Sequence, residues 1–201
     1  MHQRTRTGPS APGPLGHAAW WRDVRRTYRY AHGNRFIRVL QCIRSPGVHA
    51  VSVVRFGQWS SRLPWPLRLV SDPVYLVLNA LIKIAWGIDI PRAARIGPGL
   101  YIGHFGSLTI SRQAVIGRDC NLSQDITIGQ SGHGARCGAP VIGDNVYIAP
   151  GARLFGKITI GNNVKIGANA VVCADIPDNA VVALAPGWQI LSYRGNAPTE
   201  D

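Results

Sequence analysis

Residues 154–172 have the sequence LFGKITIGNNVKIGANAVV, in which Leu154, Ile160 and Ile166 are separated by six positions each. The same spacing of aliphatic residues, usually followed by a small residue, extends back to Ile96. A short fixed period of this kind is typical of β-helices, because each repeat supplies one strand and one turn. The sequence therefore predicts a mainly β fold, a left-handed parallel β-helix of hexapeptide repeats.

The chain divides into four predicted segments. Residues 1–18 are polar and rich in Pro and Gly, which predicts a disordered tail. Residues 19–88 have apolar residues at helical spacing and predict a basic helical N-terminal region, in which Asp72-Pro73 predicts the start of a helix. Residues 89–188 form the repeat, and at three repeats per triangular coil they predict roughly five coils. Residues 189–201 leave the repeat as a C-terminal tail.

Charge is concentrated in the N-terminal part of the chain. The 201 residues carry a net charge of +12, yet residues 1–88 hold 13 Lys/Arg and 2 Asp/Glu, against 9 and 8 in residues 89–201. Arginines interleaved with Trp and Tyr predict a peripheral contact with an anionic membrane. A helical cap with a solvated arginine face is the alternative. Nucleic acid is not an expected partner, because no base-reading motif accompanies the charge.

Location is predicted from the absence of targeting patterns in the sequence. The first sixteen residues have no apolar run typical of a secretory signal. The apolar stretch 67–88 is interrupted by Asp72, Pro73, Asn79 and Lys83, so it is not expected to span a bilayer. The predicted location is the cytoplasm, with a peripheral contact at the inner face of the membrane.

Four cysteines are scattered along the chain without close pairs. This distribution argues against a structural zinc site and against a dense disulfide framework. Cys120 and Cys173 lie within the repeat, where small interior residues are needed. Both are therefore predicted to be buried small hydrophobic residues.

The six-residue period breaks at two places. Between Ile102 and Ile110 the spacing is eight residues, and the extra residues fall around His104. Between Ile128 and Ile142 the spacing is fourteen, because residues 131–140 are inserted. Polar, Gly-rich insertions leave a coil as loops, and loops on rigid scaffolds commonly carry function. Each break contains a histidine, which makes both breaks candidate sites.

Three segments resemble one enzyme family. Residues 89–104 (DIPRAARIGPGLYIGH), 122–129 (LSQDITIG) and 141–148 (VIGDNVYI) resemble the serine acetyltransferases, and the similarity covers roughly residues 86–190. The short helical N-terminal region resembles, more narrowly, the related O-acetyltransferases of exopolysaccharide biosynthesis. The resemblance implies an acyltransferase that uses acetyl-CoA as co-substrate, requires no metal, and acts as a homotrimer.

The resemblance implies two catalytic residues. His104 matches the family's catalytic base, and Asp89 matches the carboxylate that orients it. The chemistry is consistent with these roles, since a neutral imidazole can take the proton of a hydroxyl as it attacks a thioester. A carboxylate on the other ring nitrogen fixes the tautomer and stabilises the imidazolium.

The family also binds acetyl-CoA in a groove between neighbouring subunits. Small residues and one lysine match this groove here: Gly129, Ala149, Pro150, Lys165, Gly167 and Ala168. Ordinary repeat residues are the alternative for each of them, because corners of a β-helix require small residues in any case.

The expected acceptor depends on three departures from the family pattern. The family has Asp, Arg and His where this chain has Gly103, Gly138 and Ala139, and those side chains help hold the charged groups of serine. Their loss predicts a neutral acceptor, the hydroxyl of a sugar or polysaccharide intermediate. A serine O-acetyltransferase of cysteine biosynthesis and a non-catalytic β-helix scaffold are the alternatives. Whether His133 replaces the missing histidine is left open.

Overall fold

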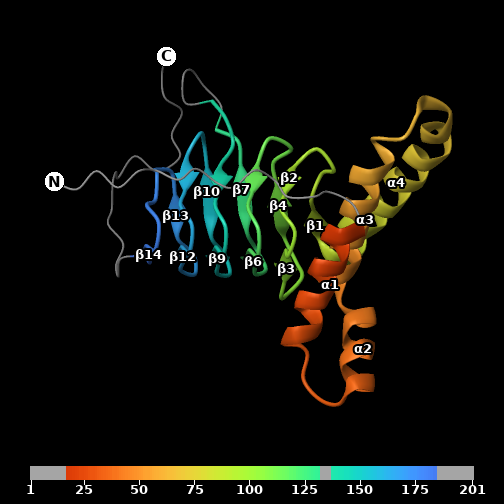
Figure 1. The fold of residues 1–201 in the computed structure, drawn as a ribbon. Helices are drawn as coiled ribbons and strands as arrows, with labels where there is room; N and C mark the ends of the chain where they lie inside the picture. Colours follow the sequence, from red (N-terminus) through yellow and green to blue (C-terminus); the bar gives the residue numbers. More distant parts are fainter. Residues whose placement is uncertain (1–16, 132–136, 185–201) are drawn as a thin grey trace, which may run out of the picture.

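The computed structural model describes residues 17–131 and 137–184, which form a helical end and a stack of β-coils (Figure 1). The described residues begin with four helices: α1 (His17–Tyr30), α2 (Arg35–Arg44), α3 (Pro46–Ser60) and α4 (Trp65–Trp86). Ser45 caps α3, since its hydroxyl accepts a hydrogen bond from the Val48 N–H. The last strand lies at the opposite end of the molecule from these helices.

The strands form three flat faces, and every pair of neighbouring strands is parallel. Face 1 holds β1 (Ile88–Asp89), β4 (Leu108–Ile110), β7 (Thr127–Gly129), β10 (Arg153–Phe155) and β13 (Val171–Val172). Face 2 holds β2 (Arg95–Ile96), β5 (Val115–Ile116), β8 (Val141–Ile142) and β11 (Thr159–Ile160). Face 3 holds β3 (Tyr101–Ile102), β6 (Asn121–Leu122), β9 (Tyr147–Ile148), β12 (Lys165–Ile166) and β14 (Val181–Val182). The fold is the predicted left-handed parallel β-helix with an N-terminal helical region.

Strand register shows what the two breaks in the period do. Arg153 pairs with Val171, eighteen positions later, which is the regular length of one coil. Ile88 pairs with Leu108, twenty positions later, so the break around His104 adds two residues to the first coil. Thr127 pairs with Arg153, twenty-six positions later, so the second break adds eight. Both insertions therefore leave the coil while the strands above and below stay in register.

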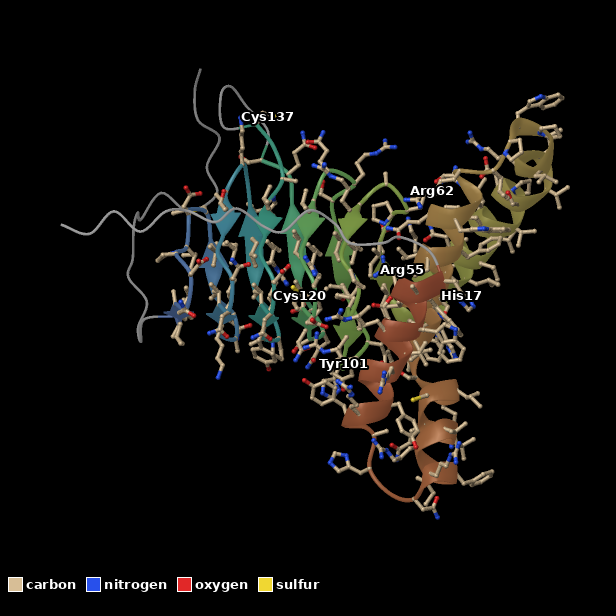
Figure 2. All side chains as sticks on the ribbon, in the orientation of Figure 1. His17, Arg55, Arg62, Tyr101, Cys120 and Cys137 are labelled. Atoms are coloured by element: carbon tan, nitrogen blue, oxygen red, sulfur yellow. The ribbon has the colours of Figure 1, made fainter. Side chains whose placement is uncertain are left out.

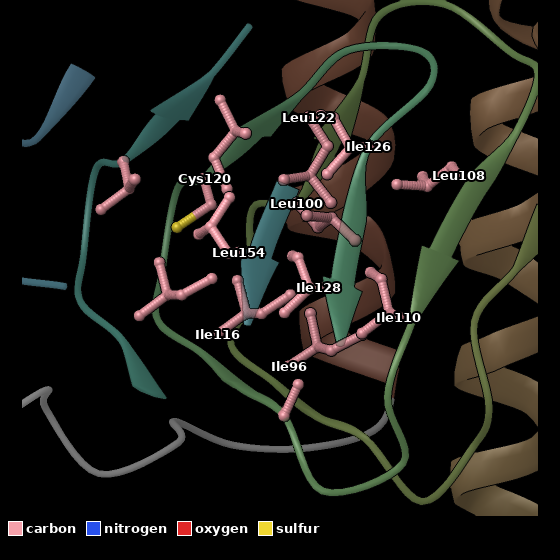
Figure 3. Packing of buried hydrophobic residues seen from close by; sticks show 14 of the residues in the cluster. Ile96, Leu100, Leu108, Ile110, Ile116, Cys120, Leu122, Ile126, Ile128 and Leu154 are labelled. Atoms are coloured by element: carbon pink, nitrogen blue, oxygen red, sulfur yellow. The ribbon is translucent and has the colours of Figure 1, made fainter. Parts of the chain in front are cut away.

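Aliphatic side chains fill the interior in continuous files (Figure 3). On face 2, Ile96, Ile116, Ile142 and Ile160 lie directly above one another, and each is at most 1% exposed. Burial of one such side chain contributes about 1.5–3 kcal/mol. The aliphatic side chains of a single coil would be exposed above and below, so this stabilisation requires the coils to stack.

Asparagine residues form one corner of successive coils. Asn145, Asn163 and Asn179 have φ angles of 56°, 56° and 63°, in the left-handed region that Asn tolerates better than most residues. Their side chains also form a ladder, in which the Asn145 amide donates to Asn163 and the Asn163 amide donates to Asn179, at 3.0 and 2.8 Å. These three residues therefore form tight corners of successive coils.

A buried ion pair fastens the helices to the first coil. Asp23 of α1 and Arg55 of α3 are 1% and 4% exposed, and Arg55 Nε lies 2.8 Å from Asp23 Oδ2. The Arg55 guanidinium also donates to the carbonyl groups of residues 96–97 at 2.7–2.8 Å. Asp23 Oδ1 accepts from the N–H groups of residues 99–100 at 2.6–2.8 Å. Both charges are thus satisfied by the coil that they cover.

Two details of the sequence-based expectation are wrong. A helix was predicted to begin at Asp72-Pro73, but α4 runs without interruption from Trp65 to Trp86, with Pro73 inside it. By length and composition α4 is also apolar enough to cross a membrane. Cys173, predicted to be buried, is exposed because it follows β13 at the outer surface, whereas Cys120 is fully buried as predicted.

The buried ion pair yields a stability prediction. Replacing Asp23→Ala leaves Arg55 charged and buried without its carboxylate, so the free energy of unfolding should fall by about 3–5 kcal/mol. Denaturant unfolding followed by Trp fluorescence measures it. The matched control is Arg22→Ala, which removes an exposed ion pair to Asp119 and should change stability by less than about 1 kcal/mol. Equal effects of the two variants would contradict the anchoring role of Asp23.

The cysteines yield a second prediction. Burial raises the pKa of the Cys120 thiol to about 12, so the native protein should protect it from disulfide reagents. Cys42 is also buried, whereas Cys137 and Cys173 are exposed. Ellman's reagent should therefore label two thiols rapidly in the native protein and all four after unfolding. A Cys173→Ser variant should lose one rapid thiol; labelling of Cys120 at the rate of Cys137 would contradict the buried assignment.

Candidate active site at the first break of the repeat

Asp89 directly follows the end of the longest helix. Gly87 ends α4 in the left-handed conformation (φ 63°), with its N–H bonded to the Lys83 carbonyl. This turn leads at once into β1, which carries Asp89. The Asp89 carboxylate lies 2.8 Å from Lys83 Nζ, and both side chains are about two-fifths exposed. The last turn of α4 therefore supplies a cation beside the predicted carboxylate.

His104 lies in the loop that joins β3 to β4, and its side chain is exposed. Gly106 and Ser107 turn the loop with φ angles of 110° and 48°. The neighbouring Phe105 ring packs edge-on against Trp86 of α4, with ring centroids 5.4 Å apart. The aromatic contact holds the His104 loop against the C-terminal end of α4, at the same helix end that Lys83 and Asp89 occupy.

The structure thus brings His104 and Asp89 to one end of α4 by different contacts. Leu108 N–H donates to the Gly87 carbonyl at 3.0 Å, which joins the chain beyond the loop to the chain just before Asp89. Within residues 17–131 and 137–184, the Asp89 carboxylate forms its ion pair with Lys83. The direct contact between Asp89 and His104 stays a prediction, and catalytic hydrogen bonds often tighten only when substrate is bound.

The His104 loop belongs to one edge of the β-helix, which we call the first edge. It consists of the corners between face 3 and face 1, at residues 103–107, 123–126, 149–152 and 167–170. Backbone hydrogen bonds stack these corners: Asp125 to Gly106 at 2.8 Å, Gly151 to Gln124 at 3.2 Å, and Asn169 to Pro150 at 2.9 Å. The edge is therefore a continuous ridge that starts at the His104 loop.

Five of the six residues predicted to bind CoA lie on or beside the first edge. Ala149 and Pro150 follow β9, and Gly167 and Ala168 follow β12 at the next coil. Lys165 is exposed on β12, two positions before Gly167. The predicted phosphate-binding lysine and the predicted small-residue corners thus line the same ridge as His104.

Gly129 lies at a different edge. It ends β7, where the chain leaves face 1 for face 2, and a Cβ there would lie 2.6 Å from the Phe155 ring. Its lack of a side chain is thus explained by packing inside the subunit. We call this the second edge, and the second insertion emerges from it immediately after Gly129.

The second insertion begins and ends in an ordered bridge. Ser131 N–H donates to the Gly138 carbonyl at 3.1 Å, in an antiparallel pair. Ala139 is 8% exposed, and a Cβ at Gly138 would lie 3.0 Å from the Lys157 side chain. Of the two positions where the family has Arg and His, Ala139 is therefore buried and Gly138 lies close against Lys157. His133 lies outside the described residues.

Asp125 of the first edge forms an ion pair with Arg153, at the start of β10. Asp125 lies one coil beyond the His104 loop, and its carboxylate lies 2.9 Å from the Arg153 guanidinium. Arg153 also donates to the Asp125 carbonyl. Among residues 17–131 and 137–184, no group of three or more His, Cys, Asp or Glu residues could hold a metal ion.

Sequence reasoning missed three residues of this site: Lys83, Trp86 and Phe105. Trp86 and Phe105 join α4 to the His104 loop, and Lys83 joins α4 to Asp89 of β1. One signal was present, because Lys83 lies in the last turn of a helix that ends just before Asp89. A side chain in that turn necessarily lies near the first residues of β1.

The chain was then compared with known proteins. Residues 139–175 match the model described as bacterial transferase hexapeptide, six repeats. A serine acetyltransferase from Synechococcus elongatus is 34% identical over 160 residues, which cover 79% of this chain and 61% of that protein. One from Mycobacterium tuberculosis is 36% identical over 154 residues, covering 76% and 64%. The chain is similar to serine acetyltransferases. It spans somewhat more than three-fifths of the length of these relatives.

Solved structures agree with this similarity. The serine acetyltransferase from Brucella abortus has a TM-score of 0.70 at 27% identity, covering 84% of this chain and 66% of that one. Serine acetyltransferase isoform 3 from Entamoeba histolytica, solved in complex with cysteine, has a TM-score of 0.68 at 28% identity, covering 87% and 60%. The similarity extends through most of the chain and includes the helical region.

These findings correct the predicted acceptor. The expectation of a sugar or polysaccharide acceptor, and of closeness to exopolysaccharide O-acetyltransferases, is wrong, because the similar proteins are serine acetyltransferases. The error lay in treating the loss of charged side chains at Gly103, Gly138 and Ala139 as a sign of a neutral acceptor. Missing side chains show which groups do not hold the acceptor; they do not identify the acceptor.

Proposed function

We propose that this protein is an acetyl-CoA-dependent serine O-acetyltransferase whose catalytic base is His104. The observation that carries the proposal is the position of His104 at the start of the first edge, the ridge that also carries four of the small residues matched to the family's CoA groove. The similarity to serine acetyltransferases supports serine as the acceptor.

The proposed reaction moves an acetyl group from the sulfur of acetyl-CoA to the hydroxyl oxygen of serine. The serine hydroxyl oxygen attacks the thioester carbonyl carbon while a neutral ring nitrogen of His104 takes its proton. The tetrahedral intermediate collapses, the carbon–sulfur bond breaks, and the protonated imidazole returns the proton to the departing thiolate. The products are O-acetylserine and CoA. Backbone N–H groups of the first edge are the proposed donors to the oxyanion.

Asp89 is the proposed orienting carboxylate. Lys83 places an opposite charge 2.8 Å from the Asp89 carboxylate. When substrate binds, a shift of the exposed His104 side chain toward Asp89 would fix the tautomer that leaves one ring nitrogen free to accept a proton. Lys83 would then balance the charge of the carboxylate.

The homotrimer and the cytoplasmic location stay predictions. The trimer has a geometric rationale, because His104 lies on the first edge whereas Gly129 and the second insertion lie on the second edge. Packing of triangular subunits around a three-fold axis would let the first edge of one subunit approach the second edge of its neighbour. The site would then be shared between two subunits.

Release of CoA thiol from acetyl-CoA in the presence of L-serine tests the proposal. The His104→Ala variant should lose about 10²–10⁴-fold in kcat, because it lacks the general base, with little change in the KM for acetyl-CoA. Asp89→Asn should lose less. The matched control is His32→Ala, an exposed histidine in the α1–α2 turn, which should keep full activity.

Two results would contradict the proposal. Retention of activity by His104→Ala would show that His104 is not the general base. Absence of serine-dependent thiol release in the unmodified protein would remove the function itself, and if calorimetry then showed no binding of acetyl-CoA, the non-catalytic scaffold would be the better account.

A further inference from the structure

Helix α4 packs a mixed side, which includes Ile82 and Trp86, against the protein and turns an apolar side away from it. The residues that it buries, fully or partly, include Ser71, Asp72, Tyr75 and Asn79. The opposite side, which we call the α4 face, carries Leu69, Val70, Leu76, Val77, Leu81 and Ile84, and these are 55–84% exposed. An amphipathic helix of a water-soluble surface has the reverse arrangement. The exposed side therefore suits an apolar environment.

Polar contacts fix α4 in this orientation. The Asp72 carboxylate lies 2.5 Å from the Arg92 guanidinium, which belongs to the first coil. Tyr75 accepts a hydrogen bond from the Arg92 N–H at 3.1 Å, and its ring packs so closely on α3 that a Cβ at Gly57 would lie 2.3 Å away. Rotation of α4 by half a turn would bury the apolar side and break all of these contacts.

The same contacts indicate that α4 lies along an apolar phase rather than across it. A spanning helix would place the elements bonded to it at the depth of the hydrocarbon, yet α4 is bonded to the first coil of the β-helix through the charged Arg92. A helix with one exposed apolar side is typical of proteins that lie in the interface of a bilayer. Trp65, 75% exposed at the start of α4, is of the type enriched at that interface.

Charge on the helical region is complementary to an anionic surface. Its two acidic residues, Asp23 and Asp72, are both paired internally. Five exposed arginines of the helical region have no acidic partner among residues 17–131 and 137–184: Arg25, Arg29, Arg35, Arg44 and Arg62 (Figure 2 labels Arg62). The helical end of the molecule thus carries both exposed positive charge and an exposed apolar face.

This charge distribution decides between two occupants of the α4 face. A two-fold contact with a second copy would bring together two helical regions of the same positive charge, whose acidic residues are already paired internally. An anionic bilayer offers hydrocarbon for the apolar side chains and negative headgroups for the arginines. We propose that the protein docks on anionic phospholipid membranes through the α4 face. The proposal is independent of the acetyltransferase activity.

Co-sedimentation of the full-length protein with phospholipid vesicles tests the proposal. Vesicles of phosphatidylcholine with about a third phosphatidylglycerol should bind the protein about tenfold or more tightly than phosphatidylcholine alone, given roughly a fivefold gain per arginine near the surface. The triple variant Val70→Gln, Val77→Gln, Ile84→Gln should lower binding to anionic vesicles by about a hundredfold or more. These side chains are exposed, so circular dichroism should show an unchanged fold.

The matched control changes apolar side chains of similar exposure elsewhere. Val171→Gln with Val181→Gln alters positions that are 65% and 74% exposed on the β-helix, and it should leave vesicle binding within about twofold. Absence of binding by the unmodified protein, equal binding to neutral and anionic vesicles, or full binding by the triple variant would each overturn the proposal. If sedimentation instead showed that the triple variant loses an oligomer and vesicles had no effect, the occupant would be a second copy.

Discussion

The rest of the structure depends on the stacking, from coil to coil, of the aliphatic side chains that recur every six residues. The aliphatic residues of one coil are buried by those of the coils above and below. The stacked isoleucines of face 2, from Ile96 to Ile160, show this. Strands of two or three residues supply the side chains that fill the interior, so the corners can vary in length and sequence. Function can then be placed at corners and insertions without disturbing the core.

The edges of the β-helix arrange the proposed chemistry. Corners of the first edge are joined coil to coil by backbone hydrogen bonds, so the His104 loop and the small residues 149–150 and 167–168 form one rigid line. The first edge meets α4 at the His104 loop. There Trp86 packs against Phe105, and Lys83 forms an ion pair with Asp89. The helical region is therefore part of the site as well as a cover for the first coil, which the Asp23–Arg55 pair fastens in place.

The period alone predicted the fold and the two insertions, because a six-residue spacing has few structural solutions and its interruptions must leave the coil. The contacts of α4 could not be predicted in this way. Pro73 indicated a helix start, yet the ion pair of Asp72 and the packing of Tyr75 hold the helix together through that residue. Exposure of Cys173 and pairing of Lys83 with Asp89 likewise depend on neighbours that are distant in sequence. The acceptor was mispredicted because absent side chains define no ligand.

We propose that the first edge carries the thioester to His104, and a crystal structure of the protein with CoA tests this. The pantetheine arm should follow residues 167–168 and 149–150, and its sulfur should lie within hydrogen-bond reach of the His104 ring. A CoA molecule bound along another edge, or with its sulfur away from His104, would show that the first edge does not have this role.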